Sequence, residues 1–201
     1  MPAKAAAPPA AAAKGEWLVT CAGLAGAYPD GPAHRHNGGV HQPGIRVRPV
    51  ADSDRPTIAW LIEELWGSPV QVVHGTVFRP AGLPGLIAER ATRLAGLLTY
   101  DVTDGTLEVI TLNALERRSG VGTLLMEEAA AEARRQGCRQ IRLTTTNDNL
   151  DALRFYQRRG LRMVALRPGA VDRARLDKPE IPRTGDYGIP LRDEIDLARP
   201  V

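Results

Sequence analysis

A glycine-containing loop at the start of a predicted helix holds the residues of this sequence best suited to bind a phosphate. The apolar spacing predicts a strand over residues 106–112 and a helix over residues 121–136. Between them, Gly120 and Gly122 let a bulky anion approach the backbone closely. The first turn of a helix adds unpaired N–H groups and the positive end of the helix dipole. A pyrophosphate is the ligand that this loop predicts.

Two other phosphate-binding loops do not fit. A dinucleotide-binding fingerprint needs a third glycine where Leu125 stands, and an acidic residue after the next strand, where Thr146 and Asn147 stand. A triphosphate-binding P-loop needs Gly-Lys-Ser/Thr, but Thr123 and Leu124 follow the second glycine. On the glycines alone, an ordinary helix entry without a ligand stays open.

Two motifs extend the pattern into a family resemblance. The run Arg117-Arg118-Ser119-Gly120-Val121-Gly122 resembles the Gln/Arg-x-x-Gly-x-Gly/Ala signature of the GCN5-related N-acetyltransferases (GNAT). Residues 149–161 resemble the family segment Asn-x-x-Ala-x-x-Phe-Tyr-x-x-x-Gly-Phe. The resemblance covers residues 45–166. It departs from the common family residues at Ala114, Arg118 and Leu161.

The resemblance implies that acetyl-CoA binds along these motifs. Loop N–H groups would hold its pyrophosphate, and the preceding strand would pair with its pantetheine arm. The implied cofactor-binding residues are Ile110, Leu112, Arg117, Arg118, Ser119, Gly120, Val121, Gly122, Thr123, Asn149, Ala152 and Tyr156. Asn149 also suits a helix cap, and the two roles are compatible.

Tyr156 is the candidate proton donor for acetyl transfer. It shares one helix face with Asn149 and Ala152, and the resemblance puts that face on the cofactor, with the hydroxyl near the sulfur. The departing thiolate needs a proton, which a tyrosine can supply. A plain core aromatic beside Phe155 is the alternative.

Glu108 is the candidate base. An alkyl amine with a pKa of ~10 is protonated at neutral pH, so a base is useful. Strand alternation predicts that Glu108, Ile110 and Leu112 face the same side of the sheet. A backbone N–H near Ile110 could stabilise the thioester oxyanion. His74 and Glu89 are weaker candidates, and a solvent-facing Glu108 is the alternative.

The order of elements predicts a mixed α/β (α+β) fold with a central, mostly antiparallel sheet flanked by helices. The resemblance implies that acetyl-CoA lies in a cleft between two central strands. Residues 178–197 are predicted to form a Pro/Gly-rich segment that could act as a lid, and then a closing edge strand. The acidic residues in this tail would attract a cationic amine or lie on a solvated edge, and they are Asp186, Asp193 and Glu194.

Composition limits the other functions. The net charge is +3, and no dense basic run indicates a nucleic-acid partner. No apolar run reaches the ~18 residues of a membrane helix. Cys21 and Cys138 form no disulfide framework or metal-ligand spacing, which favours a cytoplasmic protein. Residues 1–44 are predicted to be a disordered Ala/Pro/Gly-rich extension whose histidines bind no metal, and residues 45–201 a single domain.

The resemblance therefore implies an acetyl-CoA-dependent N-acetyltransferase, and we expect it to need no metal. A primary amine would attack the thioester directly in a ternary complex. The acceptor would be a small amine, an antibiotic-like amine or a protein amine. A non-catalytic acyl-CoA-binding regulatory module is the alternative, and the presence of Tyr156 argues against it. Since many relatives are dimers, the resemblance also favours a homodimer.

Overall fold

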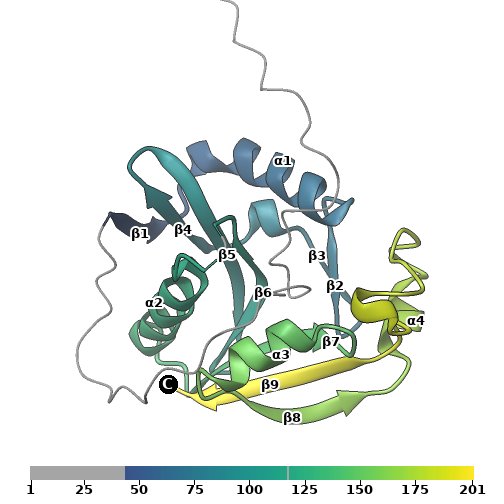
Figure 1. Cartoon of the computed structure of the whole chain (residues 1–201). Helices are drawn as coiled ribbons and strands as arrows, with labels where there is room; N and C mark the ends of the chain where they lie inside the picture. Colours follow the sequence, from purple (N-terminus) through teal and green to yellow (C-terminus); the bar gives the residue numbers. More distant parts are fainter. Residues whose placement is uncertain (1–43, 117) are drawn as a thin grey trace, which may run out of the picture.

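In the computed structural model of the protein, the described residues are 44–116 and 118–201 (Figure 1). The main sheet contains β1 (Ile45–Pro49), β4 (Gly85–Arg90), β5 (Arg93–Thr103), β6 (Thr106–Ala114), β7 (Gln140–Thr146), β8 (Arg162–Arg167) and β9 (Glu194–Pro200). A separate hairpin contains β2 (Gln71–Val73) and β3 (Thr76–Phe78). The helices are α1 (Arg55–Trp66), α2 (Val121–Arg135), α3 (Leu150–Gln157) and α4 (Ala170–Ala174).

The seven strands of the main sheet are ordered β1-β4-β5-β6-β7-β9-β8. Every neighbouring pair is antiparallel except β6 and β7, which run parallel. The predicted mixed, mostly antiparallel fold is therefore confirmed. No helix in the described part of the chain is both long and apolar enough to cross a membrane. The predicted extension lies, apart from Gly44, outside the described residues, as do its histidines His34, His36 and His41.

Helices cover both faces of the sheet. Because side chains alternate along a strand, Ile87 and Leu97 pack against α1, whereas Leu86 and Leu98 pack into the cluster that contains α2 and α3. We call these sides the α1 face and the α2/α3 face. The helices lie around the twisted sheet in this arrangement in Figure 1. Candidate groups on β6 and β7 can therefore point to either face.

Gly96 on β5 allows the first turn of α2 to lie against the sheet. A Cβ atom at this position would be 2.4 Å from Val121 Cγ1 and 2.9 Å from the Asn113 carbonyl oxygen. We expect Gly96→Ala to lower the free energy of unfolding by about 2 kcal/mol, since overpacking forces the helix away. Urea denaturation measures this loss. Gly82→Ala is the control, because its Cβ would meet nothing within 4 Å, and equal stabilities would contradict the prediction.

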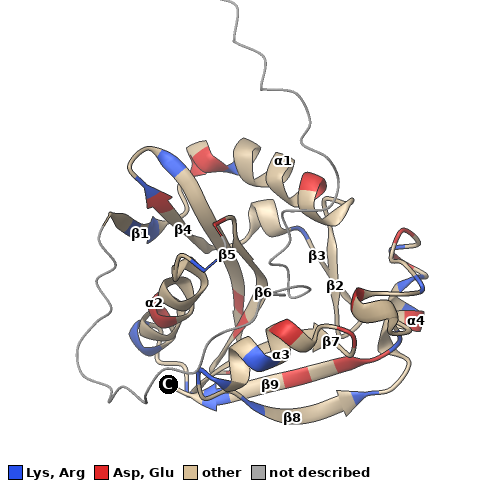
Figure 2. Cartoon of the chain, viewed as in Figure 1, with Lys and Arg blue, Asp and Glu red and all other residues tan. Residues whose placement is uncertain are grey.

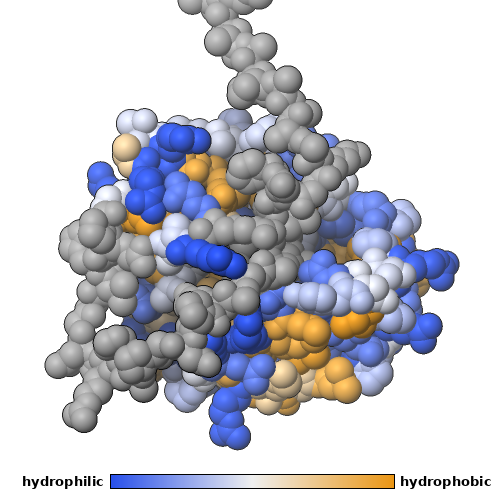
Figure 3. Space-filling model, viewed as in Figure 1, coloured by the Kyte–Doolittle hydropathy of each residue, from blue (hydrophilic) through white to orange (hydrophobic). Residues whose placement is uncertain are grey.

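The prediction that the C-terminal strand closes the edge of the sheet is wrong. β9 lies between β7 and β8, and β8 is the edge strand. Glu194 and Asp196 on β9 are buried, with 6% and 2% of their surface exposed, so the solvated-edge interpretation is also wrong for Glu194. β8 instead exposes Met163, Val164 and Leu166, and hydrophobic surface is visible near the lower edge of the molecule in Figure 3.

Residues 71–78 form the short β2–β3 hairpin. His74 and Gly75 form its turn with φ angles of 53° and 75°. Two consecutive positive φ angles are typical of a type I′ hairpin turn, whose twist matches that of the strands. The turn places His74 at the tip of the hairpin.

Candidate functional site

β6 and β7 separate in the middle of the sheet. They pair only from Thr106–Gln140 to Val109–Leu143, although β6 continues to Ala114 and β7 to Thr146. Beyond the last pair, the facing backbone groups of the two strands do not bond each other. An extended ligand that carries amides can use such groups, as a peptide uses the edge of a sheet.

A β-bulge at Ile110 changes which side chains of β6 face which side. Thr99 pairs with Thr111, but Tyr100 pairs with Val109, so Ile110 is an extra residue. Thr111 Oγ1 lies 2.8 Å from Thr99 Oγ1. Such bulges occur next to active sites, where they redirect a side chain.

The prediction that Glu108, Ile110 and Leu112 share one face is wrong because of this bulge. Leu112 packs in the α2/α3 core. Asn113 accepts a 3.2 Å hydrogen bond from Trp66 of α1 and so lies on the α1 face. Thr99 and Asp101 are two residues apart on β5, so their side chains point to the same face, which is the α1 face. Glu108 pairs with Asp101 and therefore also lies on the α1 face. The alternation of side chains along a strand predicts their faces only where the pairing with the neighbouring strand is regular.

The described part of the glycine loop (residues 117–123) runs from Arg118 into the first turn of α2. Gly120 has a φ of 79° and precedes the helix, and the first intrahelical bond joins the Leu124 amide to the Gly120 carbonyl at 3.0 Å. The amides of residues 121–123 consequently have no acceptor inside the helix, and only that of Val121 donates to a side chain of the loop, Ser119 Oγ at 3.4 Å. Ser119 Oγ donates to the Glu116 carbonyl at 2.7 Å and braces the loop. Arg118 has a φ of 57°, and the predicted residue Arg117 lies outside the described residues.

Arg159 is a cation beside this loop that the sequence analysis missed. Its guanidinium donates to Thr123 Oγ1 and lies 3.5 Å from the centroid of the Phe155 ring. The same ring covers the loop, because a Cβ atom on Gly122 would be 3.1 Å from Phe155 Cζ. The end of α3 therefore packs on the start of α2 and brings a positive charge to it. A basic residue four positions after Phe155 is the sequence signal that could have revealed this contact.

α3 carries three further candidate residues, all of them buried: Asn149, Ala152 and Tyr156. Asn149 Oδ1 accepts from the Ala152 amide at 3.0 Å, and Asn149 Nδ2 donates to Thr145 Oγ1 at 3.0 Å. The helix-cap role of Asn149 is thus confirmed. Tyr156 is 1% exposed and meets Phe155 edge to face, with ring centroids 5.2 Å apart. It belongs to the core of the α2/α3 face.

A polar cluster occupies the α1 face near the point where the strands separate. We call it the His74 cluster; it comprises His74, Glu108, Arg142, Thr144, Arg167, Glu194 and Asp196. Both Glu108 oxygens accept from Arg142, at 3.2 and 2.9 Å. Figure 2 shows the acidic residues in β9 that belong to it. Glu89, the other carboxylate considered from the sequence, is instead paired with Arg48 at 2.8 Å.

His74 connects the strands of this cluster. Its Nε2 atom lies 2.8 Å from Asp196 Oδ1 and 2.9 Å from Thr144 Oγ1. Its Nδ1 atom lies 3.7 Å from Glu108 Oε1. The imidazole is therefore held between two carboxylates on separate strands.

The two carboxylates of β9 have opposite pKa shifts. Burial alone would raise the pKa of Asp196, but hydrogen bonds from Arg167 and His74 outweigh it and lower that pKa. Burial raises the pKa of Glu194, although the nearby His74 opposes this. Among the described residues, Glu194 Oε2 has no hydrogen-bond partner. Asp196 is therefore an ionised acceptor, and Glu194 has one free acceptor oxygen.

Comparison with known proteins assigns the family. The model of the acetyltransferase (GNAT) family matches residues 51–161. The chain belongs to the GNAT family. It is 35% identical over 156 residues to the uncharacterized protein YxbD of Bacillus subtilis (strain 168), a match that covers 77% of this chain and 98% of YxbD.

Solved structures of other acetyltransferases share the fold of this GNAT protein. The IAA acetyltransferase from Bacillus cereus ATCC 14579 matches with a TM-score of 0.61 and 18% identity, covering 78% of this chain and 99% of that one. A GNAT family acetyltransferase from Elizabethkingia anophelis with acetyl-CoA bound has a TM-score of 0.57 and 17% identity, covering 79% and 99%. At these identities the likeness concerns the fold.

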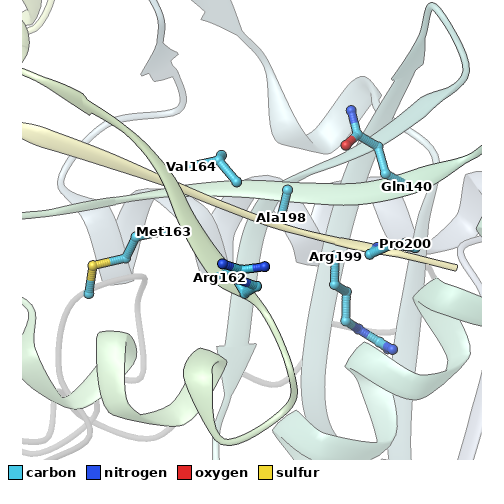
Figure 4. A pocket seen from close by; sticks show the side chains of 7 residues that line it. All are labelled: Gln140, Arg162, Met163, Val164, Ala198, Arg199 and Pro200. Atoms are coloured by element: carbon cyan, nitrogen blue, oxygen red, sulfur yellow. The ribbon is translucent and has the colours of Figure 1, made fainter.

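A hollow of about 400 Å³ lies elsewhere on the sheet, beside β7, β8 and β9 (Figure 4). Its lining residues are Gln140, Arg162, Met163, Val164, Ala198, Arg199 and Pro200. It contains no residue of the glycine loop, of α3 or of the His74 cluster. We therefore treat it as separate from the candidate site.

Proposed function

We propose that this GNAT family protein is an acetyl-CoA-dependent N-acetyltransferase that acts on a primary amine by direct attack in a ternary complex. The observation that carries the proposal is the position of the glycine loop. The loop begins α2 at the end of β6, the strand that separates from β7. The similar Elizabethkingia anophelis structure, which has acetyl-CoA bound, supports this choice of donor.

In this proposal the donor binds from the α2/α3 face. The amides of residues 121–123, with Arg118 and Arg159, hold the diphosphate. The backbone near Ile110 and Leu112 forms hydrogen bonds with the pantetheine arm. An N–H at the bulge donates to the thioester carbonyl oxygen as negative charge develops on it. Tyr156 donates a proton to the thiolate.

The acceptor approaches from the α1 face. Glu108, held by Arg142, attracts its protonated amine there. An amine on a small molecule, an antibiotic-like molecule or a protein fits this chemistry equally well, so the acceptor must be found by experiment.

A thiol-release assay tests the proposal. Acetyl-CoA is offered with a panel of alkyl polyamines, aminoglycosides and peptides that carry a free N-terminus or lysine. We expect at least one class to release thiol well above the rate without an acceptor. Calorimetric binding of CoA without transfer to any class would favour a non-catalytic acyl-CoA-binding module instead. Absence of CoA binding would contradict both functions.

A further inference from the structure

We propose that His74 accepts the proton of the acceptor ammonium, that Asp196 positions the imidazole, and that Glu108 binds the same ammonium as a second acceptor. This inference rests on the proposed function and defines the acceptor side of the same site. It gives Glu108 a binding role in place of the base role, because Arg142 already bonds both of its oxygens.

The hydrogen bonds of His74 determine which nitrogen is available. Asp196 is ionised and can only accept, so the 2.8 Å contact requires a proton on His74 Nε2. Thr144 Oγ1 donates to the same Asp196 oxygen at 3.0 Å and fixes its direction. In the neutral imidazole the lone pair is therefore on Nδ1, which faces Glu108.

The gap between His74 and Glu108 matches one ammonium group. Nδ1 and Oε1 are 3.7 Å apart, too far for a hydrogen bond between them. They are close enough for both to accept from one nitrogen that carries three N–H donors. A primary ammonium satisfies both atoms at once, whereas a quaternary ammonium satisfies neither.

The position of the cluster matches the place where the strands separate. Thr144 follows Leu143, the last residue of β7 that pairs with β6, and Glu108 precedes Val109, the last such residue of β6. His74 contacts both sides of this point from its hairpin turn. Its positive φ of 53° is uncommon for a residue other than glycine, and such conformations concentrate at functional sites.

Charged side chains from four strands surround the imidazole. β6 contributes Glu108, and β9 contributes Asp196 and Glu194, which lies near His74. Two arginines balance two of these carboxylates, Arg142 of β7 pairing with Glu108 and Arg167 of β8 with Asp196. The imidazolium that forms would be held next to carboxylates contributed by two strands.

The proton balance of the step is complete. One ammonium proton moves to His74 Nδ1, and the neutral amine nitrogen forms a bond to the thioester carbonyl carbon. The carbon–sulfur bond then breaks, Tyr156 protonates the thiolate and is reprotonated from solvent, and the amide nitrogen releases its second proton to solvent. His74 releases its proton to solvent, so an ammonium and acetyl-CoA become an amide, CoA thiol and one proton.

Nitrogen NMR tests the binding geometry without any turnover. The chain has four histidines, so the full chain with His34, His36 and His41 changed to glutamine retains His74 as its single imidazole. We expect a proton on Nε2, and a shift of the Nδ1 resonance on adding n-butylammonium chloride. Tetramethylammonium chloride has the same charge and no N–H group, so it should cause no shift. A proton on Nδ1, no shift, or equal shifts with both salts would overturn the inference.

Acceptors of different basicity test the proton transfer. His74→Asn is the variant, because asparagine tolerates a positive φ. We expect kcat/KM for an alkyl amine to fall at least ~10-fold, and that for an aryl amine, which is neutral at pH 7, to stay within ~2-fold. Equal losses for both acceptors would show that His74 has a structural role only. If the wild type binds CoA and acetylates no amine, the proposed function fails, and the NMR result alone decides the ammonium geometry.

Discussion

Gly122→Asp should weaken acetyl-CoA binding at least ~100-fold, both alone and in combination with Arg117→Ala. The new carboxylate would stand at the positive end of the α2 dipole, where the diphosphate is proposed to bind, and would repel it. Its Cβ would also lie 3.1 Å from Phe155 Cζ, so the packing of α3 on the loop must shift. Isothermal titration calorimetry with CoA measures the loss.

Gly122→Ala separates charge from size in this experiment. It introduces the same Cβ without the carboxylate, so we expect a loss of affinity of only ~10-fold or less. Thermal unfolding of each variant shows whether the fold is retained. If folded Gly122→Asp binds CoA as tightly as the wild type, the glycine loop is not the diphosphate site.

Tyr156→Phe should lower turnover at least ~10-fold and leave CoA affinity unchanged. The substitution removes only the hydroxyl, and a general acid typically contributes ~10²-fold or more to the rate. Loss of a group that acts in the transition state lowers kcat and kcat/KM together. Thiol release with any acceptor found in the panel provides the measurement.

The control for this variant is Tyr187→Phe. Tyr187 is 60% exposed and donates its hydroxyl to Asp151 of α3, so its loss perturbs the same helix without touching the proposed chemistry. We expect its turnover to match that of the wild type. Equal turnover in Tyr156→Phe would remove Tyr156 from the mechanism.

Much of the fold could be predicted because hydrophobic periodicity and glycines mark the elements locally. The helix predicted over residues 121–136 matches α2, and Gly137, with a φ of 69°, follows its end. The bulge at Ile110 could not be predicted, since it depends on how β6 pairs with β5 and no residue type in β6 marks the extra position. β9 was misplaced for a related reason. Alternating acidic residues occur both on a solvated edge strand and on an interior strand such as β9. Only the contacts with residues far away in the sequence distinguish the two positions.

The residues of the candidate site could also be predicted only in part. Sequence motifs gave the residues of the glycine loop and α3, which are close together along the chain. Arg159, Thr144 and Asp196 were missed because their contacts span 36, 70 and 122 residues. The folded sheet brings Thr144 and Asp196 to His74, and no local pattern records those separations, whereas the spacing of Arg159 from Phe155 was a local signal.

The bulge at Ile110 also has a thermodynamic consequence. It directs Glu108 toward the α1 face, beside His74, while Tyr156 packs on the opposite side, so the sheet separates His74, which is proposed to accept a proton, from Tyr156, which is proposed to donate one. A double-mutant cycle over His74 and Tyr156 should then give a coupling energy near zero, with the two rate losses multiplying.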